Sequence, residues 1–224
     1  LILAAGIINF GGGNVACKKV SRGQILLVGA MLMPLGLLPL VKGNLMLICG
    51  AISIATMAYF LYYRQYRLAL ITLIVPIASA MFFWALSGQH LQILPGYMAG
   101  MSQMVFGYTE AMALEGNNRE VFLYLLGAGG ITWLLWRSAK LDDPTRIYMC
   151  LCFALFLFIA FKEGFVRQDG HAVKAATSLI IAALVSGFIV LHRRLIIVVL
   201  IVLMASGYIY KNHVAASVQQ ALTN

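Results

Sequence analysis

One segment between two long apolar runs gathers side chains that could hold an anion and move a proton: Lys162, Arg167, Asp169, His171 and Lys174. An arginine binds a phosphate or carboxylate through two parallel hydrogen bonds, and lysines add point charges. A histidine transfers protons near neutral pH, and a neighbouring aspartate either orients it or acts as a base. The alternative is a solvated turn with an internal Arg–Asp pair. Because ionisable groups at a membrane face are costly and often mark function, we favour a binding or catalytic loop.

A second segment, residues 90–116, has apolar and aromatic side chains at helical spacings of three and four: Tyr97, Met101, Met104, Val105, Tyr108 and Met112. It is more polar and shorter than a membrane span and begins after the Pro95-Gly96 break. We therefore predict a helix that lies in the membrane interface, with its apolar stripe against lipid or the helix bundle. Glu110 would then be presented to a substrate at the membrane edge, with Tyr108 beside it. The alternative is that Glu110, Glu115 and Glu120 simply face water.

The amino-acid composition indicates which kind of structural element positions these two segments. Of 224 residues, 62% are hydrophobic and only 10% are charged, which is too few charges to cover a water-soluble fold. The same numbers exclude a disordered chain and a secreted disulfide scaffold. Apolar runs become helices in a bilayer because every backbone group must be paired internally. The runs are Leu1–Phe10, Gln24–Val41, Leu45–Tyr63, Leu68–Leu86, Val121–Trp136, Ile147–Phe161, Ala175–Leu191 and Leu195–Tyr210.

These runs predict an all-α, polytopic bundle of about eight transmembrane helices, the first of them partial, that forms a single transmembrane domain over residues 1–224. The chain begins with Leu1 and is apolar from its first residue, without the basic start of a signal peptide. We therefore expect it to be part of a longer chain.

The distribution of the 16 lysines and arginines predicts the orientation. With eight spans, ten of these residues fall on one side of the membrane and six on the other, and the positive-inside rule makes the richer side cytoplasmic. Segments 90–116 and 162–174 then both lie on the exoplasmic side. The net charge of +9 is explained by topology and lipid headgroups, and no nucleic-acid-binding motif accompanies it.

Metal and redox chemistry find little support in the sequence. Cys150 and Cys152 are two apart, which is not a C-x-x-C pair, and no nearby histidine completes a metal set. Asp142-Asp143-Pro144 resembles an acidic pair that holds a metal, but a helix start ahead of Ile147 explains it better. We predict neither a metal site nor a cofactor, although a divalent metal could assist the reaction considered next.

Two short motifs add a resemblance. Gly107-Tyr108-Thr109-Glu110-Ala111-Met112 and Phe165-Val166-Arg167-Gln168-Asp169-Gly170-His171 resemble segments of bacterial membrane proteins of cell-surface polysaccharide assembly. The architecture is similar to integral-membrane (GT-C type) glycosyltransferases and O-antigen polymerases or ligases. The likeness implies a polyprenyl-diphosphate-linked sugar donor, an exoplasmic active site and the bacterial inner membrane. It also implies a base, Glu110 or Asp169, and a diphosphate held by Arg167, Lys162 and His171.

The chain departs from the GT-C pattern at one place. That family carries its acidic motif in the first exoplasmic loop, which here is only Lys42-Gly43-Asn44. Either the motif lies upstream of Leu1 or the family assignment is wrong.

The function predicted from these observations is a membrane-embedded transferase that acts on a lipid-linked saccharide at the exoplasmic face. Its catalytic residues would be Glu110, Asp169 and His171, and its substrate would be bound by Lys162, Arg167, Lys174 and Tyr108. Two other classes stay open. A non-catalytic subunit would use the Met-rich stretch Tyr97–Met112 as a surface for a protein partner. A transporter or flippase would use helices broken at Pro34, Pro39 and Pro76.

Overall fold

The computed structural model describes the backbone of residues 21–112, 116–139, 141–167, 169–189 and 195–223. Side chains are described for the same residues except 44, 104–112 and 215–223. All regular elements in this part of the chain are helices, which confirms the predicted all-α class. The contacts divide the helices into two compact units, Ile2–Tyr108 and Thr109–Asn224.

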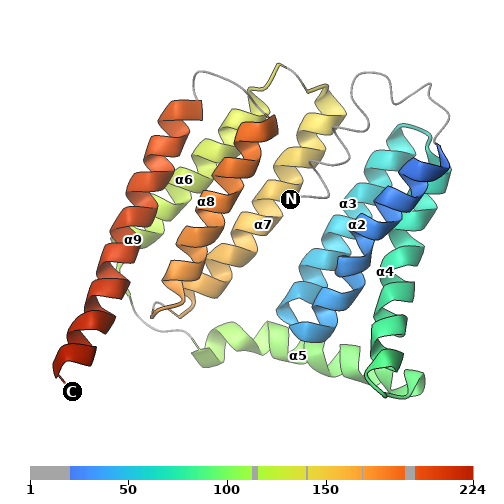
Figure 1. Cartoon of the computed structure of the whole chain (residues 1–224), viewed down its shortest axis with the longest axis horizontal. Coiled ribbons are helices and arrows are strands. Elements are labelled where there is room, and N and C mark those ends of the chain that lie inside the picture. Colours follow the sequence, from blue (N-terminus) through green and yellow to red (C-terminus); the bar gives the residue numbers. More distant parts are fainter. Residues whose placement is uncertain (1–20, 113–115, 140, 168, 190–194, 224) are drawn as a thin grey trace. The chain divides into compact units, whose positions relative to one another are not determined.

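The first of these units is built on three long helices that pack side by side (Figure 1). They are α2 (Arg22–Val41), α3 (Asn44–Tyr62) and α4 (Tyr66–Leu86), followed by the short 3₁₀ helix η1 (Leu91–Ile93) and by α5 (Leu94–Met112). A capping box begins α2, because the Ser21 hydroxyl accepts from the Gln24 N–H and the Gln24 side chain accepts from the Ser21 N–H. The start of the first described helix is therefore fixed by the local sequence.

Helices α2 and α4 approach each other closely at a glycine. A Cβ atom added to Gly36 would meet the carbonyl oxygen of Pro76 and lie 2.7 Å from the main-chain nitrogen of Ala80. Nearby, the hydroxyl of Ser79 donates a 2.7 Å hydrogen bond to the Met33 carbonyl across the two helices. Small residues of this kind let helix backbones approach in an apolar solvent, where packing rather than hydrophobic burial joins helices.

The first part of α5 runs across the end of this bundle where α2 and α4 finish (Figure 1). The hydroxyl of Tyr97 donates to the Leu40 carbonyl at 3.1 Å, and the Tyr97 ring lies 4.9 Å from the Trp84 ring, centre to centre. A Cβ atom added to Gly43 would lie 3.0 Å from the sulfur of Met101. The apolar stripe predicted for this helix is thus used, at Tyr97 and Met101, for contact with the bundle.

The second unit is a bundle of α6 (Asn118–Trp136), α7 (Asp143–Phe165), α8 (Ala172–Ile189) and α9 (Leu195–Thr223), in which α6 contacts the other three. Its interior is dense in small side chains with almost no exposed surface: Ala172, Ala175, Ala176, Ala182, Ala183 and Ala205. At Gly127 of α6 an added Cβ atom would lie 2.8 Å from a methyl carbon of Leu179. Gly127 therefore serves close helix packing.

Among the described residues, six helices are long and apolar enough to cross a membrane: α2, α3, α4, α7, α8 and α9. Large apolar side chains on them face outward, such as Leu26 and Phe188, which are 73% and 86% exposed. Such surfaces suit lipid and would be unusual in a soluble monomer. The predicted span Val121–Trp136 is the helix α6 but is not among the six, and Leu1–Phe10 lies outside the described residues. The chain is therefore an integral membrane protein by the character of its helices.

Candidate functional site at the loop between α7 and α8

The loop between α7 and α8 joins two helices that are each long and apolar enough to cross a membrane. The two helices meet closely on either side of it. A Cβ atom added to Gly164 would lie 2.5 Å from the Cβ of Ala175 and 3.3 Å from the His171 carbonyl oxygen. Only a residue without a side chain fits at this place, and the loop ends are held together as a result.

Within this loop, Asp169 is bound by its neighbours on both carboxylate oxygens. One Nη atom of Arg167 lies 2.9 Å from Oδ2. Oδ1 accepts a 3.0 Å hydrogen bond from the main-chain N–H of His171 and lies 2.5 Å from Nδ1 of the same residue. The three side chains predicted from the sequence to act together are thus brought together, with Asp169 at the centre.

These contacts set the protonation state of the aspartate. The hydrogen bond from the His171 main-chain N–H, together with the His171 ring and the Arg167 guanidinium, lowers the pKa of Asp169 to about 2. A carboxylate with so low a pKa is ionised at neutral pH and is a weak proton acceptor. The geometry therefore favours the orienting role for Asp169 over the role of base.

His171 and Arg167 keep surface for a ligand. Their side chains are 33% and 35% exposed. Because Nδ1 of His171 is directed at Asp169, its Nε2 atom is the ring nitrogen left to meet a substrate. Arg167 contacts the carboxylate through one nitrogen, Nη2, and a guanidinium carries five N–H donors in all.

The two predicted lysines flank the loop. Lys162 is half-buried in the last turn of α7, and Lys174 is exposed in the first turn of α8. The main-chain N–H of Lys174 donates to the His171 carbonyl at 2.9 Å, which places these residues one turn apart. The side chains of Tyr108 and Glu110 lie outside the described residues, so their predicted roles stay predictions.

A second polar cluster, which the sequence reading missed, joins α6 to α9. One alternative drawn from the sequence had Glu120 facing water, but it is only 2% exposed. Its carboxylate accepts from the Asn212 side chain at 2.8 Å and lies 2.9 Å from Nε2 of His213. The signal in the sequence was the polar pair Asn212-His213 at the end of the last apolar run.

No group of three or more His, Cys, Asp or Glu side chains in the described residues is arranged to hold a metal. Helix α7 begins at Asp143 with Asp142 as its N-terminal flanking residue, and Asp143 forms a 3.0 Å ion pair with Arg146. This confirms the helix-start interpretation of the Asp142-Asp143-Pro144 motif.

Comparison with known proteins identified no relative of this chain. The chain matches no protein-family model, no curated protein and no solved structure. The candidate site therefore depends on its own geometry.

Proposed function

We propose that this protein is a membrane-embedded transferase that acts at the membrane edge on a lipid-linked saccharide, with the loop between α7 and α8 as its active site. The observation that supports the proposal is the contact of Asp169 with both Arg167 and His171. An aspartate that holds one nitrogen of a histidine leaves the other nitrogen as an oriented acid–base group.

In this scheme His171 is the catalytic base and Asp169 is a positioning residue. Nε2 of His171 takes the proton of the acceptor hydroxyl while the new C–O bond forms at the sugar. The bond between that sugar carbon and the lipid diphosphate breaks, and the diphosphate leaves with the electron pair. Asp169 stabilises the imidazolium that results, because it stays ionised at neutral pH.

The cations would stabilise the leaving group. Arg167 is suited to a diphosphate by its planar fork of donors. Lys162 and Lys174 add charge from the adjoining turns of α7 and α8. Charge stabilisation by groups already in place is often the largest single contribution to catalysis.

The membrane arrangement that goes with this function has about eight spans and an exoplasmic active site in a bacterial inner membrane. Helix α6 and the apolar segment 1–10 would join the six candidate spans. Helix α5 would lie in the exoplasmic interface, as its course across the ends of α2 and α4 supports (Figure 1). The distribution of lysines and arginines supports an exoplasmic position for residues 162–174.

The test is a profile of surface glycans in cells that carry the full-length protein with Arg167→Gln, Asp169→Asn or His171→Gln. Loss of one defined glycan at a normal membrane level of protein is the expected result. The matched control is Asp143→Asn, which removes the carboxylate of an Arg–Asp ion pair at the other end of α7.

An unchanged glycan profile in all three variants would overturn the proposal. So would an equal loss in Asp143→Asn, because the effect would then follow from weakened helices rather than from the loop. In either case we would conclude that the loop is a solvated turn with an internal ion pair.

A further inference from the structure

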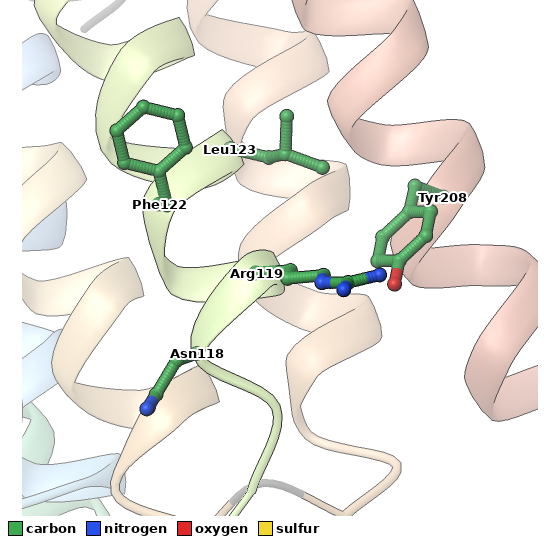
Figure 2. Close-up of a pocket in the computed structure, with 5 residues that line it drawn as sticks. All are labelled: Asn118, Arg119, Phe122, Leu123 and Tyr208. Atoms are coloured by element: carbon green, nitrogen blue, oxygen red, sulfur yellow. The ribbon is translucent and has the colours of Figure 1, made fainter.

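A pocket of about 380 Å³ opens on the outside of the second unit, between the start of α6 and the middle of α9. It is lined by Asn118, Arg119, Phe122, Leu123 and Tyr208. Figure 2 shows the guanidinium of Arg119 reaching toward the hydroxyl of Tyr208, with Phe122 and Leu123 one turn further along α6. The pocket thus has a polar, cationic mouth and an apolar wall.

The charge of Arg119 is not neutralised by a carboxylate in the described part of the chain. No ion pair joins it to a carboxylate among the residues that the structure describes. The adjacent residue Glu120 is turned inward, where Asn212 and His213 take up its carboxylate. Lys211 is exposed three residues after Tyr208, which places it on the same face of α9. The mouth therefore carries an excess of positive charge.

The apolar wall continues along α6. Phe122 is 66% exposed, and Leu126, four residues later on the same face, is 47% exposed. Tyr208 belongs to a candidate membrane span. A molecule with its charged end at Arg119 would therefore have its apolar part along a surface suited to the hydrocarbon of a bilayer.

From these features we infer that the pocket is a binding site for an anionic phospholipid. Arg119 and the Tyr208 hydroxyl bind its phosphate, and an acyl chain lies against Phe122 and Leu126. A guanidinium and a hydroxyl are both donors to phosphate oxygens. This pocket shares no lining residue with the loop between α7 and α8, and the inference does not depend on the proposed transferase activity.

A phospholipid fits better than a free anion or a lipid diphosphate. Free phosphate would gain nothing from the apolar wall. A diphosphate calls for more charge than Arg119 in the pocket lining and Lys211 beside it supply, whereas the loop between α7 and α8 offers Arg167 with Lys162 and Lys174. The single guanidinium matches one phosphate group.

The experiment is a titration of the full chain, purified in a neutral detergent, with phosphatidylglycerol, while native mass spectrometry counts the bound lipid. Arg119→Gln is expected to weaken this binding by roughly tenfold, in line with the loss of charge-assisted hydrogen bonds. The matched control is Arg137→Gln, because Arg137 is an exposed arginine just after the other end of α6; it should leave binding unchanged. Phe122→Ala should also weaken binding, without a change of charge.

Three results would overturn the inference. The first is an equal loss in Arg119→Gln and Arg137→Gln, which would mean bulk attraction to charge. The second is equal affinity for phosphatidylcholine, which would mean an apolar contact that ignores the headgroup. The third is binding of inorganic phosphate alone that matches phosphatidylglycerol. Arg119 is exposed, so the variants should keep the melting temperature of the parent, and Phe122→Ala provides a second test that leaves every charge in place.

Discussion

Nε2 of His213 lies 2.9 Å from Oε2 of Glu120, and this contact joins the last turn of the candidate span in α9 to the first turn of α6. The carboxylate is 3% exposed and the histidine side chain 17% exposed. A buried carboxylate is tolerated because partners supply its hydrogen bonds. The cluster therefore joins the first helix of the four-helix unit to its last helix.

Glu120→Ala should destabilise the protein by about 2–3 kcal/mol, because it leaves Asn212 and His213 without their shared acceptor. Denaturant unfolding in detergent, followed by circular dichroism, measures the change. The adjacent Arg119→Gln is the control, and it should change stability by less than about 0.5 kcal/mol because Arg119 is exposed. Equal stability of the two variants would show that the buried cluster contributes nothing.

Gly36→Ala should separate α2 from α4 and lower stability by about 1–3 kcal/mol, the usual cost of overpacking. The new Cβ atom would meet the backbone of α4 at Pro76 and Ala80, which cannot rotate away. Gly29→Ala on the same helix has open space around it and should be neutral or slightly stabilising. Thermal unfolding of both variants measures the difference, and a stable Gly36→Ala would contradict the close approach.

Gly164→Ala should disturb the candidate site without touching its functional groups. Its Cβ atom would lie 2.5 Å from that of Ala175 and push apart the helix ends that hold the loop. We expect loss of the glycan that Arg167→Gln abolishes. Gly170→Ala, in the same loop but with nothing within 4 Å of its Cβ, should keep the glycan; loss in both variants would mean that the loop tolerates no substitution.

The carboxyl group of Asp169 should titrate with a midpoint near its pKa of about 2, below the 3.8 that is usual for the residue. Because the folded-state pKa is lowered, the stabilisation is complete above pH 3.8 and is lost as the pH falls toward 2. Carbon-13 NMR of labelled aspartate measures the midpoint, with Asp169→Asn identifying the signal. Arg167→Gln should raise the midpoint only slightly, because the main cause, the His171 main-chain N–H, remains. A midpoint at the usual value would mean that the cluster does not form in solution.

The sequence by itself determined the class of the protein and the location of its helices. A chain with few charged residues and long apolar runs is suited to lipid. In lipid the runs form helices, since each backbone group must bond within its own segment. Local signals such as Asp142-Asp143-Pro144 likewise predicted a helix start that α7 confirms. The contact of Asp169 with Arg167 and His171 could also be predicted from the sequence, because each of these residues follows the previous one by two positions.

The tertiary structure decided what depends on residues far apart in the chain. Glu120 is expected at the surface from its neighbours alone, yet it is buried by partners 92 and 93 residues away. The same holds for Gly36, whose need for space comes from Pro76 and Ala80 on another helix. Hydropathy reports only that a helix prefers lipid; which of its faces meets another helix depends on shape and hydrogen bonds that no local pattern encodes.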